Sequence, residues 1–143
     1  MMASSATILL VEDNPDDAAL TELALRGGWP AHLEVARDAR EAFDYLFGDT
    51  REAPRLVLLD LRLPDSEGLE VLRRIREDER TRLIPVVILT SSMAAGDVAA
   101  SYRLGANSYV RKPVDFDQFA DRVREIGSYW LGINESPSNV RDQ

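Results

Sequence analysis

Four short apolar runs, each followed by polar residues, constrain the fold of this sequence more than any other feature. The first three are rich in Val, Ile and Leu, and the four lie at residues 7–11, 56–59, 86–89 and 108–110. Short runs of this kind are typical of strands buried on both faces of a parallel sheet. In open parallel sheets the functional groups collect just beyond the carboxyl ends of the strands. We therefore expect the residues that follow these runs to meet at one edge of the sheet and form a site.

Helical patterns alternate with these runs and with one further strand pattern at residues 32–36. Asn14, Asp38 and Asp115 are residues of the kind that cap helix N-termini, and each precedes apolar positions spaced three and four apart. Strand and helix therefore alternate five times along the sequence. This alternation predicts a doubly wound α/β domain, in which helices cover both faces of a five-stranded parallel sheet. Periodicity alone does not determine the strand order.

Length, charge and cysteine content exclude several classes of protein. A chain of 143 residues suits a single domain, and its net charge of −8 argues against a nucleic-acid-binding surface. The sequence has no cysteine, which excludes disulfides, thiolate metal sites and cysteine nucleophiles. No apolar run approaches the ~20 residues of a membrane span, and the N-terminus lacks the pattern of an export signal. We therefore expect a cytoplasmic protein without a nucleic-acid or membrane partner.

The polar residues after the apolar runs resemble the conserved set of the receiver domain of two-component response regulators. The resemblance covers about residues 7–130, and Thr90 follows Asp60 by 30 residues while Lys112 follows Thr90 by 22. The matching positions are the acidic pair Glu12 and Asp13, the phosphoacceptor Asp60, the hydroxyl residue Thr90, Lys112 with Pro113, the loop residues Pro64 and Gly68, and the aromatic switch residue Tyr109. The resemblance implies a flavodoxin-like fold with strand order 2-1-3-4-5.

The same resemblance implies that Asp60 accepts a phosphoryl group from the phosphohistidine of a sensor histidine kinase, with Mg²⁺ as cofactor. A divalent cation reduces the repulsion between a carboxylate and an incoming phosphoryl group, and Mg²⁺ prefers oxygen ligands. The expected ligands are Asp13, Asp60 and the main-chain carbonyl of Arg62, with Glu12 acting through a bound water. Because neighbouring acids repel one another, we also expect a raised pKa for at least one of them in the metal-free protein.

Lys112, Thr90 and Tyr109 are expected to act on the phosphoryl group and to respond to it. Lys112 offers a positive charge to the transferred group, and the Thr90 hydroxyl donates to a phosphoryl oxygen. We expect Thr90 to move toward the phosphoryl group and Tyr109 to rotate inward into the space that it leaves. Such a protein promotes its own aspartyl phosphorylation and dephosphorylation, and it is not a conventional enzyme. Arg62 and Ser92 flank the path of an attacking water, which leaves the lifetime of the phosphorylated form open.

We expect a disordered N-terminus at residues 1–6, a receiver domain at 7–131 and a flexible tail at 132–143. The tail is too short for a helix-turn-helix, so the expected output is a protein contact or transfer of the phosphoryl group within a relay.

A narrower resemblance, to single-domain regulators paired with phytochrome-type histidine kinases, implies a bacteriophytochrome kinase as partner. It also implies a homodimer through the C-terminal helices, for which Tyr102, Trp130 and Leu131 are candidate contacts.

Two alternative functions are compatible with parts of this pattern. A phosphatase of the haloacid-dehalogenase type also forms an aspartyl phosphate at a strand end, but it needs an acid two residues after the nucleophile, where this chain has Arg62. A receiver-like interaction module that never takes phosphate has no need to keep Asp13, Asp60, Thr90 and Lys112 together. Both alternatives are therefore less favoured than a phosphorylated receiver.

Overall fold

Strands and helices alternate along the chain as the sequence predicts. The structure, a computed structural model, describes residues 6–28, 30–48 and 53–137. Its elements, in chain order, are β1 (Ala6–Val11), α1 (Pro15–Arg26), β2 (Ala31–Ala36), α2 (Ala39–Phe47), β3 (Leu56–Leu59), α3 (Gly68–Glu77), β4 (Val86–Thr90), α4 (Ala95–Arg103), β5 (Ser108–Arg111), α5 (Phe116–Gly127) and the π-helical turn η1 (Ser128–Ile133). None of the helices in the described ranges combines the length and the apolar composition of a membrane span.

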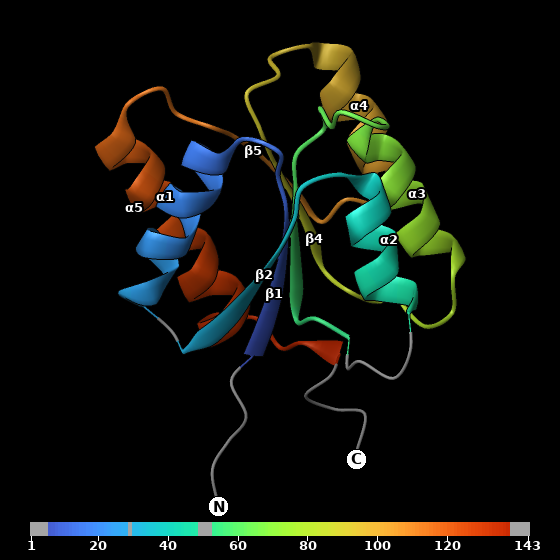
Figure 1. Cartoon of the computed structure of the whole chain (residues 1–143), viewed down its shortest axis with the longest axis horizontal. Helices are drawn as coiled ribbons and strands as arrows, with labels where there is room; N and C mark the ends of the chain where they lie inside the picture. The colour runs from blue at the N-terminus through green and yellow to red at the C-terminus, as the bar shows by residue number, and fades with distance from the viewer. Residues whose placement is uncertain (1–5, 29, 49–52, 138–143) are drawn as a thin grey trace, which may run out of the picture.

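The five strands form one parallel sheet in the order β2-β1-β3-β4-β5, which confirms the predicted fold. Helices α1 and α5 cover one face of the sheet, and α2, α3 and α4 lie on the other (Figure 1). Parallel neighbours need crossover connections, and the helices supply them. The carboxyl ends of all five strands consequently point to the same edge.

The core consists of two apolar layers, one on each face of the sheet. Side chains alternate between the faces along each strand, so Leu9 and Val11 of β1 pack toward α2 and α3, whereas Ile8 and Leu10 pack toward α1 and α5. All residues of β3 and β4 are buried. These continuous apolar runs reflect a sheet that is covered on both faces.

The predicted helix caps are present at the expected positions. The Asn14 side chain accepts hydrogen bonds from the backbone N–H groups of Asp16 and Asp17 at 2.9 and 3.1 Å. The Asp38 and Asp115 carboxylates each accept from the N–H group three residues on, at 2.8 and 2.9 Å. These bonds satisfy donors that have no partner within the helix and determine where each helix begins.

Main-chain hydrogen bonds continue one residue beyond three of the strands. The backbone N–H of Glu12 donates to Ala36 O at 2.9 Å, and that of Asp60 donates to Val11 O at 3.0 Å. Beyond β5, the N–H of Lys112 donates to Thr90 O at 2.8 Å. The first polar residues after the strands are therefore held by the sheet itself and not by mobile loops.

The last helix does not keep α-helical geometry to its end. Past Gly127 the helix widens, and the N–H of Asn134 donates to Tyr129 O, five residues back, at 2.7 Å. The wider turn places Trp130 and Leu131 half-buried against the core on the side of α1 and α5. Ser136, within the predicted tail, is buried.

The predicted domain boundaries fall partly outside the described residues. β1 begins at Ala6, one residue before the predicted start at residue 7, and η1 runs to Ile133, past the predicted end at 131. Residues 1–5 of the predicted disordered N-terminus and 138–143 of the predicted tail lie outside the described ranges. The boundaries therefore stay predictions.

Candidate functional site

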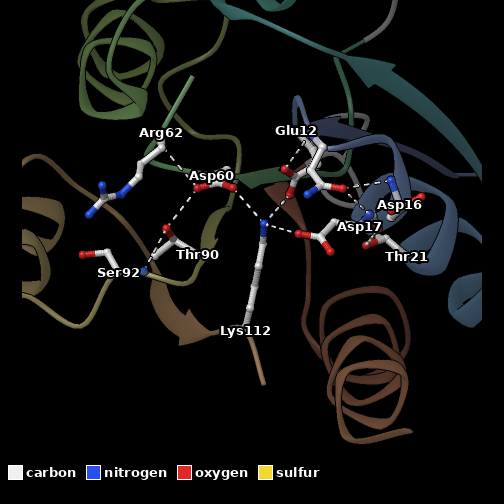
Figure 2. Close-up of polar contacts among 10 residues, drawn as sticks. Glu12, Asp16, Asp17, Thr21, Asp60, Arg62, Thr90, Ser92 and Lys112 are labelled. Atoms are coloured by element: carbon white, nitrogen blue, oxygen red, sulfur yellow. Dashed lines mark hydrogen bonds and ion pairs between the residues drawn. The ribbon is translucent and has the colours of Figure 1, made fainter. Parts of the chain in front are cut away.

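Polar side chains from four strand ends meet at the carboxyl edge of the sheet. Glu12 follows β1, Asp60 follows β3, Thr90 ends β4 and Lys112 follows β5. Figure 2 shows these side chains pointing toward one another across the edge. The structure thus brings together residues up to 100 positions apart in the sequence, as in the Lys112–Glu12 pair.

Lys112 is the centre of this cluster. Its Nζ atom donates to Glu12 Oε1 at 2.6 Å, to Asp60 Oδ2 at 2.8 Å and to Asp17 Oδ2 at 2.9 Å. The lysine side chain is only 8% exposed. An ammonium group has three N–H donors, and here each one has a carboxylate acceptor. Lys112 is therefore held by carboxylates that come from β1, β3 and α1.

Both oxygens of the Asp60 carboxylate are held. Oδ1 accepts from the hydroxyl of Thr90 at 2.9 Å and from the backbone N–H of Arg62 at 3.1 Å, while Oδ2 accepts from Lys112. Thr90 is fully buried and Asp60 is 8% exposed. The carboxylate thus has a fixed orientation at the edge of the sheet.

One acid of this cluster, Glu12, has a raised pKa, as expected from the sequence. Burial raises the pKa of Glu12 to about 7; the Asp60 charge adds to the rise, while the hydrogen bond and charge of Lys112 oppose it. The main cause is therefore burial and not the repulsion that the sequence suggested. For Lys112, burial lowers the pKa, but the hydrogen bonds and charges of Asp60 and Glu12 outweigh burial and leave the pKa raised. Lys112 is consequently charged throughout the physiological pH range.

Three acids at this edge have the geometry and chemistry of a site for a hard divalent cation. Glu12, Asp13 and Asp60 each offer a carboxylate oxygen, and these oxygens lie within 4.8 Å of one another. Glu12 and Asp60 are buried, whereas Asp13 is exposed. Carboxylate oxygens suit Mg²⁺ or Mn²⁺ and suit softer metals less well. The residues present fit such an ion, and the carbonyl of Arg62 as a further ligand stays a prediction.

The loop after β3 folds back closely onto the backbone of Asp60. A Cβ atom at Gly68 would lie 2.2 Å from Asp60 O, so only glycine fits at this position. The same loop carries Asp65, whose carboxylate accepts from the backbone N–H groups of Ala39 and Arg40 at 2.9 and 3.0 Å. The loop that follows Asp60 is thereby fixed to the start of α2.

Ser92 links Thr90 to Tyr109. The N–H of Ser92 donates to Thr90 Oγ1 at 3.4 Å, and the Tyr109 hydroxyl donates to Ser92 O at 3.2 Å. The Ser92 hydroxyl also donates to the carboxylate of Asp97 in α4. Tyr109 is half-buried in this arrangement, and its predicted rotation stays a prediction.

Sequence reasoning missed two residues of this region. Asp17 lies in the first turn of α1, where an acid complements the helix N-terminus, and its ion pair with Lys112 has no signal in the local sequence pattern. Asp65 lies in the loop between Asp60 and Gly68, and nothing in its sequence position indicates that it caps a helix that begins 26 residues earlier. Both roles depend on how separate elements pack, which spacing along the chain does not reveal.

The sequence matches the profile of the response regulator receiver domain over residues 8–124. It is 48% identical over 134 residues to FilR2 of Methanothrix harundinacea, a probable methanogenesis regulatory protein, with 91% of this chain and 86% of that protein covered. It is 40% identical over 129 residues to the response regulator Rcp1 of Synechocystis sp., with 87% of this chain and 88% of that protein covered.

Two solved structures resemble the fold over nearly its whole length. The phosphorylated cyanobacterial phytochrome response regulator RcpA has a TM-score of 0.88 and 36% identity, covering 94% of this chain and 99% of its own. The Mn²⁺-bound form of Rcp1 has a TM-score of 0.87 and 36% identity, covering 92% of this chain and 99% of its own.

Proposed function

Because this chain belongs to the response regulator receiver family, we propose that Asp60 is the side chain on which it accepts a phosphoryl group from a histidine kinase. The chain has the phosphoryl-accepting role of a receiver in a two-component system. One observation carries the choice of Asp60: Thr90 and Lys112, from two further strand ends, each hold one of its carboxylate oxygens. Three acids, a hydroxyl and an ammonium group thereby surround one position where a phosphoryl group can bind.

In the proposed reaction the ionised carboxylate of Asp60 attacks phosphorus directly. The O–P bond to Asp60 forms as the N–P bond of the phosphohistidine breaks, and the histidine keeps the electron pair of that bond. No general base is needed, because the nucleophile carries no proton. Lys112 is already at 2.8 Å from Asp60 Oδ2, so its positive charge lies where negative charge arrives. Asp13 and Asp60 would hold Mg²⁺, with Glu12 acting through a bound water, and the ion would further neutralise this charge.

We propose that Thr90, Ser92 and Tyr109 transmit the change at Asp60 to the surface. The Thr90 hydroxyl now donates to Asp60 Oδ1, and a phosphoryl oxygen would be a stronger acceptor. A shift of Thr90 would alter its contact with Ser92, and Ser92 O in turn accepts from Tyr109. The response is then a change in population between two side-chain arrangements.

The alternatives considered from the sequence are not favoured. A haloacid-dehalogenase-type phosphatase needs an acid where this chain has Arg62, which is exposed and whose N–H binds Asp60. An interaction module that is never phosphorylated would not need Thr90 and Lys112 to bind the carboxylate of Asp60, as they do here.

Incorporation of phosphate from a small acyl-phosphate donor in the presence of Mg²⁺ tests the proposal. We expect the intact protein to gain one acid-stable, hydroxylamine-labile phosphoryl group, and Asp60→Asn to gain none. Asp44→Asn is the matched control, because it removes the same charge from an exposed position on α2. Full incorporation into Asp60→Asn, with the control unchanged, would show that the acceptor is a different residue.

A phytochrome-type histidine kinase is the proposed partner, since the chain is similar to Rcp1 and to the phytochrome response regulator RcpA. A histidine kinase without a phytochrome module serves as the comparison. Transfer from autophosphorylated kinases of both kinds, measured side by side, tests this choice. Faster transfer from the non-phytochrome kinase would reject it.

We also propose a homodimer through the C-terminal helices and no binding to nucleic acid. Of the predicted contacts, Tyr102 on α4 is exposed, whereas Trp130 and Leu131 are half-buried against the core. Their neighbours on η1, Tyr129 and Ile133, are large apolar side chains that are exposed in the single chain. Exposed groups of this kind favour association, and the net charge of −8 disfavours contact with phosphate backbones. Sedimentation with and without phosphodonor tests the dimer, and a monomer under both conditions at tens of micromolar would contradict it. Cytoplasmic location stays a prediction from the sequence.

A further inference from the structure

Asp17 gives Lys112 a carboxylate partner that lies outside the set of residues expected around the phosphoryl group. The Lys112 Nζ to Asp17 Oδ2 distance is 2.9 Å, close to the 2.8 Å that separates Nζ from Asp60 Oδ2. Asp17 belongs to the first turn of α1 and not to a strand end. Its side chain is 29% exposed, whereas the Lys112 side chain is 8% exposed. Figure 2 shows Lys112 between Asp60 on one side and Asp17 on the other.

Asp17 does not make the reciprocal hydrogen bond that completes a capping box at this end of the helix. Asp17 is the third residue of α1 after the capping residue Asn14, a position from which an acid often reaches back to the N–H of the cap. That N–H instead donates to Glu12 Oε2 at 3.2 Å. The Asp17 carboxylate is therefore turned away from the helix start and toward Lys112.

The bonds of Lys112 to Asp60 and to Asp17 respond differently when Asp60 takes a phosphoryl group. The bond to Asp60 must be exchanged for one to the phosphoryl group, because the new group lies between them. The bond to Asp17 lies on the far side of the ammonium group and need not break. Asp17 can thus hold the long side chain of Lys112 in place while the acceptor of Lys112 changes from the Asp60 carboxylate to the phosphoryl group. The ammonium group of Lys112 then keeps its orientation toward the site.

We propose that Asp17 is a positioning residue for phosphoryl transfer, which holds the Lys112 ammonium group in the site from α1. The inference rests on the proposed function of Asp60 and Lys112. Asp17 is not one of the three acids whose oxygens could hold the cation.

The test compares Asp17→Ala and Asp17→Asn with Asp16→Ala in the full-length chain. Asp17→Ala removes the acceptor and the charge, whereas Asp17→Asn keeps an oxygen acceptor of similar shape. Asp16→Ala removes the same charge one residue away, from a side chain outside the ion pairs of Lys112. Two quantities are measured: the rate of phosphate uptake from a small donor, and the solvent exchange of the Lys112 ammonium protons by NMR in metal-free protein.

We expect Asp17→Ala to take up phosphate about three- to tenfold more slowly, since one charge-assisted bond to a partly exposed carboxylate is lost. Exchange of the Lys112 ammonium protons is expected to become faster in Asp17→Ala. The exchange rate of Asp17→Asn should lie between those of Asp17→Ala and the unchanged protein, and that of Asp16→Ala should equal the rate of the unchanged protein. Unchanged exchange and uptake in Asp17→Ala would overturn the proposal. Effects of Asp16→Ala as large as those of Asp17→Ala would also overturn it, because they would show a general effect of charge. If Asp17→Ala does not fold, Asp17→Asn decides, with slower uptake and faster exchange expected.

Failure of this inference is distinguishable from failure of the proposed function. If the intact protein takes up phosphate on Asp60 and the Asp17 variants match it, only the role of Asp17 is wrong. If the intact protein takes up none, or Asp60→Asn takes it up, the proposed function is wrong. The exchange of the ammonium protons still reports whether Asp17 holds Lys112.

Discussion

Replacing Glu12 by Gln should make the metal-free protein more stable at pH 8 and leave its stability almost unchanged at pH 4.5. Glu12 is buried at the end of β1, and burial raises its pKa from 4.5 to about 7 in the folded chain. A group with a raised pKa in the folded state stabilises the fold at pH values below its unfolded pKa. That contribution is lost as the pH rises through the folded pKa. Gln has the shape of the protonated acid and does not titrate, so it keeps the contribution at every pH.

The expected size of the effect comes from the difference between the two pKa values. The pKa of Glu12 is 4.5 in its ordinary state and about 7 when folded. At about 1.36 kcal/mol for each whole step in pKa, the difference corresponds to about 3 kcal/mol. Lys112 stays charged over this range and donates to Glu12 Oε1, an acceptor that the Gln side chain retains. The stability of the two proteins should therefore diverge between pH 5 and pH 8.

Urea unfolding in EDTA, at pH 4.5 and at pH 8, measures this difference. With an m-value of about 2 kcal/mol/M, the midpoint of Glu12→Gln should exceed that of the unchanged protein by about 1.5 M at pH 8. Subtracting the two proteins at each pH removes the contributions of all other titrating groups. Equal midpoints at pH 8, or a lower midpoint for Glu12→Gln, would refute the reasoning that Glu12 carries an unfavourable buried charge.

Three further predictions follow from contacts outside Glu12. Asp65→Ala removes the two bonds to the start of α2 and should cost about 1 kcal/mol in urea unfolding; an unchanged midpoint would contradict the cap. Arg76→Met removes bonds to three backbone carbonyls and to Asn107, and should cost about 2 kcal/mol by the same assay, whereas a loss below about 0.5 kcal/mol would contradict their importance. Thr90→Val should still take up phosphate but lose the NMR response of Tyr109; a full response would exclude Thr90 from the switch.

The fold class and the location of the site follow from the sequence because both depend on local patterns, whereas the strand order is implied by the family resemblance. Apolar runs at residues 56–59 and 86–89 are long enough for one strand each and are buried on both faces. Parallel strands all end at one edge, so a polar residue directly after each run has to lie there. The positions of Asp60 and Thr90 needed no further information.

The parts that sequence reasoning missed depend on packing between elements. The Asp17–Lys112 pair requires a particular rotation of α1 about its axis, and the Asp65 cap requires the loop after β3 to reach α2. Arg76 lies in a stretch of charged residues that is typical of a solvated helix face, yet it is half-buried and donates to carbonyls that precede β4 and β5. The last helix widens at Ser128, directly after Gly127, but a single glycine in a helical pattern does not specify a wider turn. Such features arise from distances in space that spacing along the chain does not encode.

The most direct measurement maps the site of the phosphoryl group chemically. The protein is incubated with Mg²⁺ and a small phosphodonor, and the acyl phosphate is then reduced with borohydride, which converts a phosphorylated aspartate to homoserine. Peptide mass spectrometry should find homoserine at position 60 and aspartate unchanged at position 13. Homoserine at another position, or none in a protein that has taken up phosphate, would contradict the assignment of Asp60.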